Sequence, residues 1–237
     1  MIAESQNAAL LIVGRQASRN ENWVEYARYC FDREKGLRKE AFAHLNKFLN
    51  LSQSWETEQK IAFLQFLLPL SEIVQDADYG PLPQPLSEKL IKPSLEEWCL
   101  SETKNSDPFR WYGRYCRSVE HIDRALEINP QDDKARQILL EWGTYQLYFS
   151  VHHLPEGYIG NLTEDMELID EIRKHINQLT EPKSQEFWSK ELEEYAVLIH
   201  NYSEWKKSGH PNLEKWGEEN KRLVSYGISR TYYYDSK

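Results

Sequence analysis

The sequence predicts an all-α protein, and three observations support this prediction. Apolar residues recur every three or four positions through most of the 237 residues, whereas the alternation of apolar and polar residues that is typical of strands is almost absent. Capping residues, prolines and glycines divide the chain into segments of helical length. We therefore expect antiparallel helical hairpins that form either a solenoid or an irregular α-bundle.

Three helices are expected in the first third of the chain. Trp23, Ala27 and Cys30 predict a helix over residues 21–34, which Gly36 ends. The apolar stripe of the second helix consists of Leu37, Ala41, Leu45 and Phe48. A third helix is expected from Ser54, its N-cap, to about residue 74, and it is apolar on most sides, which indicates burial.

The segment DYGPLPQPLSEKLIKP, residues 78–93, contains four prolines and one glycine. Because proline interrupts helices, the segment predicts an extended connection with at most one short helical turn. A connection of this length is unusual inside a compact domain. We therefore expect an N-terminal helical region over residues 1–77 and a C-terminal helical-hairpin region over residues 94–237, with one continuous domain as the alternative.

The next two helices are expected on either side of a proline corner. Asp107 as N-cap and Pro108 at the first helical position predict a helix that runs to Asn129 and Pro130. Its apolar face is expected to consist of Tyr112, Tyr115, Val119, Ile122 and Leu126. The helix after Pro130 is expected to place Ala135, Ile138, Trp142, Tyr145 and Phe149 on one apolar face.

A helical hairpin and a final helix are expected in the last third of the chain. Asn161 and Glu164 resemble a capping box, and the helix that follows carries Ile169, Ile172, Ile176 and Leu179 on one face. A partner helix after Pro182 repeats the pattern with Trp188, Leu192, Tyr195, Ile199 and Tyr202. The last helix is expected to begin at Pro211 and to end near Gly227.

The corner sequence RALEINPQDDKA resembles the junction between consecutive tetratricopeptide repeats. Pro130 follows Ala125 by five residues, and Ile122 occupies the large apolar position three residues before the alanine. The resemblance implies paired helices whose inner faces line a groove for a partner segment. It covers about a dozen residues, because no second copy appears at the repeat period of ~34 residues.

Composition bears on partners and compartment. The formal charge of −9 disfavours nucleic acid and anionic membrane as partners, because both attract basic patches. The three cysteines form no CxxC pair and are expected to be free thiols, as in a reducing cytoplasm. The apolar run at residues 8–14 follows no basic segment, and the run at residues 61–70 is too short to span a bilayer. We therefore expect a cytoplasmic protein without a membrane segment.

No pattern of catalytic residues or cofactor ligands stands out. The sequence contains no Walker loop, no dinucleotide-binding glycine pattern and no GxSxG elbow. His152, His153 and Glu156 are the nearest approach to a metal site, but adjacent histidines on a helix point about 100° apart and no fourth ligand is close in sequence. We therefore predict no catalytic residue, no metal and no cofactor.

The segment RWYGRYCR carries the pattern most typical of binding. Arg110, Arg114 and Arg117 are spaced four and three residues apart, which would form a basic stripe on one helix. Trp111 and Tyr112 lie beside it, and aromatic rings among arginines are typical of peptide or base recognition. We predict these five residues as a partner-binding surface. The alternative is a solvated helix face balanced by nearby acidic helices.

These observations favour a non-enzymatic helical module that binds a protein or peptide. Two alternatives remain. One is an all-α enzyme or small-ligand binder with an internal pocket lined by aromatic and histidine side chains. The other is an inhibitor whose acidic surface blocks a basic enzyme.

Overall fold

The computed structural model describes residues 6–73 and 80–226, and within these ranges every regular element is helical. The prediction of an all-α fold is confirmed. The chain forms two compact units, Met1–His121 and Ile122–Lys237. None of the described helices combines the length and apolar character needed to cross a bilayer.

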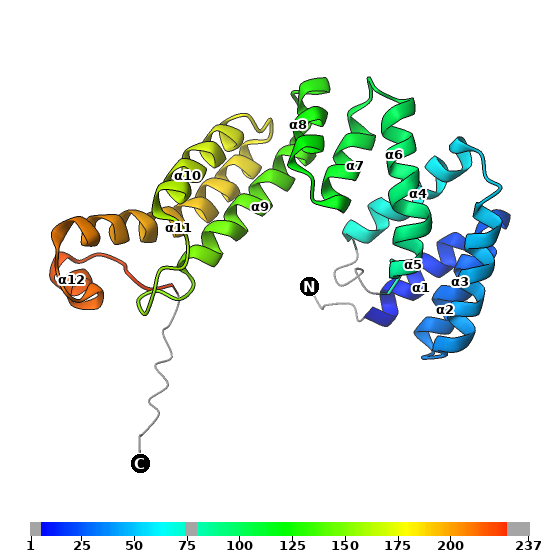
Figure 1. The fold of residues 1–237 in the computed structure, drawn as a ribbon, viewed down its shortest axis with the longest axis horizontal. Coiled ribbons are helices and arrows are strands. Elements are labelled where there is room, and N and C mark those ends of the chain that lie inside the picture. The colour runs from blue at the N-terminus through cyan, green and yellow to red at the C-terminus, as the bar shows by residue number, and fades with distance from the viewer. Residues whose placement is uncertain (1–5, 74–79, 227–237) are drawn as a thin grey trace, which may run out of the picture. The chain divides into compact units, whose positions relative to one another are not determined.

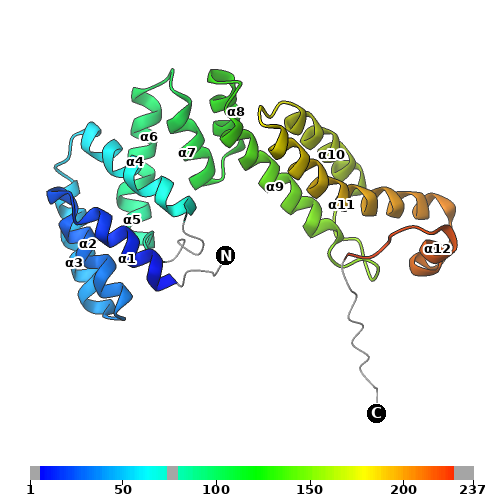
Figure 2. The same ribbon diagram turned by 180° about the vertical axis from the view of Figure 1, so that it is seen from behind.

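The first unit contains the helices from α1 to α7 and the start of α8 (Figure 1). Their bounds are α1 Gln6–Ala17, a 3-10 turn Glu21–Trp23, α2 Val24–Glu34, α3 Arg38–Ser52, α4 Thr57–Ile73, α5 Gln84–Leu86, a π-helical turn Ser87–Ile91, α6 Lys92–Ser101, α7 Ser106–Cys116 and α8 Val119–Ile128. Helix α2 packs against both α1 and α3, as the reverse view in Figure 2 also shows. The helices predicted from residue 21 to about residue 74 are therefore present, although Val74 lies outside the described residues.

Aromatic rings fill the core of the first unit. The centroids of Phe63 and Phe48 are 5.0 Å apart, and Tyr26 meets Phe63 edge to face at 5.2 Å. All three side chains are fully buried. Because large rings bury much apolar area, this cluster joins α2, α3 and α4 into one core.

The Pro-rich segment is fixed to this core by two buried tyrosines. The Tyr26 hydroxyl donates to the Pro81 carbonyl at 2.6 Å, and the Tyr29 hydroxyl donates to the Gly80 carbonyl at the same distance. Both side chains are fully buried on α2. These bonds satisfy carbonyls that have no helical partner.

The prediction of an extended connection over residues 78–93 is wrong from Gln84 onward, because the chain is helical from there to Ser101. Pro85 lies in the first turn of α5, where the amides have no intrahelical acceptor, so a proline there removes no hydrogen bond. Pro93 directly follows the π-helical turn Ser87–Ile91, at the start of α6. Residues 78 and 79 lie outside the described residues.

The single helix predicted from Asp107 to Asn129 is also wrong, because the structure divides it into α7 and α8. Arg117 adopts the left-handed conformation with φ 54° and ends α7. The helix begins earlier than predicted, since the side chain of Asn105 accepts from the backbone N–H of Asp107 and is the N-cap.

The second unit contains the rest of α8 and four further helices, which are α9 Asp133–Val151, α10 Leu162–Asn177, α11 Pro182–Ser208 and α12 Leu213–Asn220. Helices α9, α10 and α11 pack against one another, and Figure 1 shows them side by side. Asn161 caps α10 by accepting from the backbone N–H groups of Thr163 and Glu164, as its sequence predicted. The predicted helical hairpin is confirmed as α10 and α11.

The corner between α8 and α9 is fixed by polar side chains. The carboxylate of Asp132 caps α9 by accepting from the Ala135 N–H at 3.1 Å. Arg136 is buried and donates to the Pro130 carbonyl and, at 2.7 Å, to the side-chain oxygen of Gln178. The predicted helix end at Asn129 and Pro130 is confirmed, and Arg136 connects it to the end of α10.

Helix α9 buries a different face from the predicted one. Ala135 and Ile138 are buried as predicted and Trp142 is half-buried, but Tyr145 and Phe149 are exposed. The buried residues of the C-terminal half are Leu140, Gly143, Thr144, Leu147, Ser150 and Val151.

Close packing against α10 explains which face is buried. A Cβ atom at Gly143 would lie 2.8 Å from Cδ1 of Ile172, so α10 approaches α9 on its Gly143 side. That approach leaves the side of Tyr145 and Phe149 outside the core.

Candidate partner-binding surface

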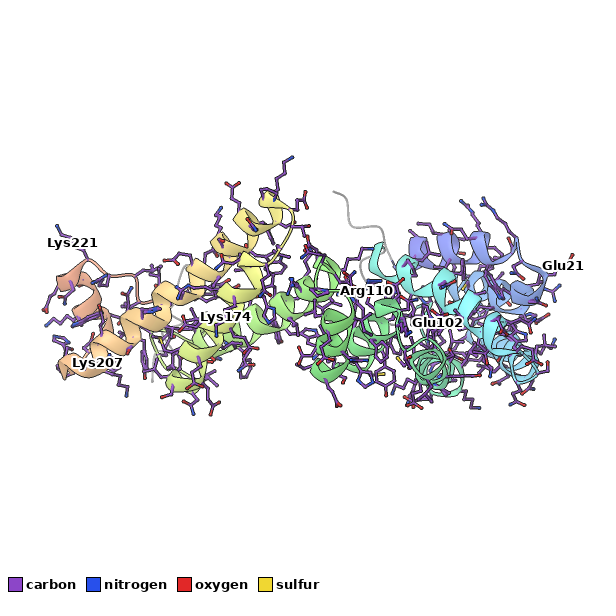
Figure 3. The ribbon with its side chains drawn as sticks, turned by 90° about the horizontal axis from the view of Figure 1, so that it is seen from above. Glu21, Glu102, Arg110, Lys174, Lys207 and Lys221 are labelled. Atoms are coloured by element: carbon purple, nitrogen blue, oxygen red, sulfur yellow. The ribbon has the colours of Figure 1, made fainter. Side chains whose placement is uncertain are left out.

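The residues predicted for partner binding do not share one exposed face. Arg110, labelled in Figure 3, is buried, and its Nη2 donates to Oδ1 of Asp107 at 2.6 Å. Its guanidinium carbon lies 5.5 Å from the ring centroid of Trp111, which belongs to the core of the first unit. The side chains of Arg110 and Trp111 therefore contribute to the packing of the first unit in the described structure.

The other three residues differ in exposure. Tyr112 is half-buried and stacks on His121, with ring centroids 4.1 Å apart. Arg114 is half-buried, and Arg117 is exposed beyond the end of α7. Because Arg117 is not helical, the expected stripe of three arginines does not form on one helix. Partner binding by these residues stays a prediction.

The histidine pair lies where α9 ends. Nδ1 of His152 lies 2.8 Å from the carbonyl oxygen of Phe149, and the ring centroids of His152 and His153 are 4.2 Å apart. Glu156 is exposed in the loop that follows. Within the described ranges, no group of three His, Cys, Asp or Glu side chains is arranged to hold a metal ion.

His152 instead belongs to a continuous group of rings that we call the α9 aromatic surface. Its members are Tyr145, Tyr148 and Phe149 on α9, His152 directly after the helix, Tyr195 on α11, and Tyr226. Tyr148 is central, because its ring centroid lies 5.2 Å from that of His152 and 5.4 Å from that of Tyr226. Tyr195 stacks on Tyr226 at 5.8 Å.

Exposure varies across the α9 aromatic surface. Tyr145 retains 64% and Phe149 retains 51% of its accessible area, whereas Tyr148 and Tyr226 are half-buried and Tyr195 is buried. The exposed rings are thus supported from beneath by other rings. Clustered exposed aromatic residues are typical of interaction sites, because a large ring in water loses the free energy that its burial would provide.

The helices that carry these rings are poor in basic residues near them. Residues 137–156, which include the C-terminal part of α9, contain Glu141 and Glu156 and no Lys or Arg. On α11, residues 191–205 also lack Lys and Arg. Burial, the hydrogen bond with Tyr226, and the charges of Tyr226, Glu191 and Glu194 raise the pKa of Tyr195 well above its ordinary value.

The loop after α9 holds the end of the helix in place. The backbone N–H of Ile159 donates to the Ser150 carbonyl at 3.1 Å, and the Tyr158 hydroxyl donates to the buried carboxylate of Asp165. Gly160 lies against the same group, because a Cβ atom there would be 2.1 Å from Oγ of Ser150. The loop therefore fixes the C-terminal end of α9, where the α9 aromatic surface lies.

Sequence reasoning placed Tyr145 and Phe149 in the core and so missed this surface. The helical period of α9 is satisfied by two apolar faces, and periodicity alone does not show which face is buried. Gly143 is the available signal, because a glycine inside a helix costs stability and often marks the close approach of a neighbouring element. No protein-family model matches the chain, and no curated protein or solved structure shows significant similarity to it.

Proposed function

We propose that this protein is a helical module that binds a protein or peptide through the α9 aromatic surface. The observation that carries the proposal is the exposure of Tyr145 and Phe149, one helical turn apart, on a helix whose opposite face is packed in a core. Aromatic anchors on a supported surface are the residues that most often dominate binding free energy.

The support beneath the rings favours this use. Gly143 packs closely on Ile172, and Leu147 and Val151 are fully buried, so the backbone of α9 is held against α10. A partner that docks on a preformed surface pays less conformational entropy than one that must order it. The resemblance of the α8–α9 corner to a tetratricopeptide junction also favours partner binding over chemistry.

A cytoplasmic location is part of the proposal. Cys30, Cys99 and Cys116 are free, as expected in a reducing compartment. Burial and the neighbouring Cys116 and Glu96 raise the pKa of the Cys99 thiol to about 11. The thiol is therefore protonated at neutral pH and is a poor nucleophile.

Selection from a random peptide display library on the full-length protein tests the proposal. We expect selected peptides to lose about tenfold or more in affinity when both Tyr145→Ser and Phe149→Ser are introduced, because each anchor contributes on the order of 1–2 kcal/mol. Circular dichroism should show an unchanged helical content, since both side chains are exposed.

Phe187→Ser is the matched control. Phe187 is similarly exposed, at 56%, and lies on α11 outside the α9 aromatic surface. Its replacement should leave peptide affinity unchanged. The proposal fails if no peptide is selected, or if the selected peptides bind the Tyr145→Ser/Phe149→Ser variant as tightly as the wild type.

A further inference from the structure

We infer that the α9 aromatic surface binds a basic segment of a partner, in which Lys or Arg side chains cover the exposed rings. The inference rests on the proposed function and adds the chemistry of the partner. Three features support it. They are the negative charge of the second unit, the carboxylates near the rings, and the contacts between cations and rings elsewhere in the chain.

The negative charge of the protein is concentrated in the second unit. Residues 122–237 contain 21 acidic and 14 basic residues, a formal charge of −7, whereas residues 1–121 contain 17 acidic and 15 basic residues, a charge of −2. The two values add up to the −9 of the whole chain. A unit with this charge attracts basic segments and repels acidic ones.

Carboxylates also lie close to the rings themselves. Glu191 and Glu194 act electrostatically on the hydroxyl of Tyr195, which stacks on Tyr226. At physiological ionic strength charges are screened over about 8 Å, so a cation bound beside Tyr195 and Tyr226 would still be attracted by the carboxylates that act on Tyr195.

A Lys or Arg side chain from a partner would match both the exposed rings and the nearby carboxylates of this surface. The face of a ring attracts Lys and Arg, and the apolar stems of these side chains cover the ring edges while their charges reach the surrounding carboxylates. A neutral apolar segment would cover the rings but would make no ion pair with Glu191 or Glu194. An acidic segment would meet repulsion from them.

The same chain shows this pairing elsewhere. On α11, the Lys206 ammonium lies 5.6 Å from the ring centroid of Tyr202 and 5.3 Å from that of Trp205. In the first unit, the Arg38 guanidinium lies 5.8 Å from the ring of Phe42. No Lys or Arg of residues 6–73 and 80–226 lies over a ring of the α9 aromatic surface, so within those ranges the position is open to a cation from a partner.

Fluorescence anisotropy with three synthetic peptides of equal length tests the inference on the full-length protein. One peptide alternates Arg and Leu, the second alternates Glu and Leu, and the third alternates Gln and Leu. We expect the basic peptide to bind at least about tenfold more tightly than the neutral one, and the acidic one to bind most weakly. Affinity for the basic peptide should fall as salt is raised from about 50 to about 300 mM.

Variants distinguish this surface from general attraction to an acidic protein. Tyr145→Ser/Phe149→Ser should weaken the basic peptide about tenfold, and Glu191→Gln/Glu194→Gln should weaken it several-fold. Glu167→Gln/Glu186→Gln removes the same charge from exposed positions on α10 and at the N-terminal end of α11, and should have a smaller effect.

Four other outcomes would overturn the inference, and each can be told apart from the rest. If the neutral or acidic peptide binds as well as the basic one and depends on Tyr145 and Phe149, the partner is not basic, although the proposed function stands. If the basic peptide binds all variants equally, its attraction is unspecific. If sedimentation shows self-association that Tyr145→Ser/Phe149→Ser abolishes, a second copy of the chain occupies the surface. If no peptide depends on the rings, the proposed function fails as well.

Discussion

Buried contacts made by single residues hold two loops of this protein in place. Tyr26 and Tyr29 place their hydroxyls on two consecutive carbonyls more than fifty residues away in sequence. In the second unit, Gly160 allows the loop after α9 to lie directly on Ser150 and on the carboxylate of Asp165. In both places, buried contacts of one or two residues position the loop.

Gly160→Ala should destabilise the protein, because its Cβ would lie 2.2 Å from Oδ2 of Asp165 and 2.6 Å from Cβ of Ser150. Asp165 and Ser150 are buried, so their side chains would have to shift within the packed interior. We expect the free energy of unfolding, measured in urea, to fall by about 1–3 kcal/mol. Gly157→Ala is the control in the same loop, since nothing lies within 4 Å of its Cβ position. Equal stability of the two variants would contradict the described packing of Gly160.

At the scale of the elements, a hydrogen bond between Glu25 and His44 connects α2 and α3. Oε2 of Glu25 lies 2.6 Å from Nδ1 of His44, and Oε1 accepts from Arg28 at the same distance. Burial raises the pKa of Glu25, but the His44 hydrogen bond and the charges of Arg28, His44 and Lys47 more than offset burial, so the pKa lies below its ordinary value of 4.5. The ionised form is therefore favoured in the folded state.

The sign of the pH dependence follows from that lowered pKa. The ionised carboxylate stabilises the fold above pH 4.5, and this contribution is lost as the pH falls through the lower, folded-state pKa. Glu25→Gln should reduce the free energy of unfolding by about 1 kcal/mol at pH 7. The difference from wild type should shrink in acid below pH 4.5, as urea unfolding at a series of pH values would show. Glu21→Gln, at an exposed position in the preceding turn, should show no such trend.

The sequence predicted the elements whose boundaries depend on local signals. Asn161 caps α10, Pro182 begins α11, and Pro130 marks the corner before α9, all of which act within a few residues. The helical path from Gln84 to Ser101 was missed, because its prolines act locally as breakers, whereas its stabilising contacts come from the burial of Leu86, Ile91 and Leu95 in the core of the first unit.

Two further errors have the same physical origin. A non-glycine residue in the left-handed conformation, such as Arg117, leaves no pattern in the sequence, so the end of α7 was not predicted. The candidate site was missed for a related reason. The choice between the two apolar faces of α9 depends on where Ile172 packs, which is a tertiary contact.

At the scale of the whole molecule, each unit has its own hydrophobic core. We therefore expect two transitions in scanning calorimetry, because a chain with separate cores need not unfold in one step. Leu64→Ala in the first core and Ile199→Ala in the second remove fully buried side chains, and each should lower the stability of its own unit by about 2–5 kcal/mol.

The two variants should shift different transitions. Leu51→Ala, at an exposed position on α3, is the control and should shift neither. A single transition that both core variants shift equally would show that the chain unfolds as one cooperative unit instead.

The absence of Lys and Arg between Arg136 and Arg173 has a practical consequence for measurement. Trypsin, which cleaves after basic residues, has no site within residues 137–172. Complete digestion should therefore release Tyr145, Tyr148, Phe149 and His152 together on one long peptide. Chemical modification of tyrosine or histidine, with and without a bound partner, could then be followed for most of the α9 aromatic surface in a single mass-spectrometric fragment.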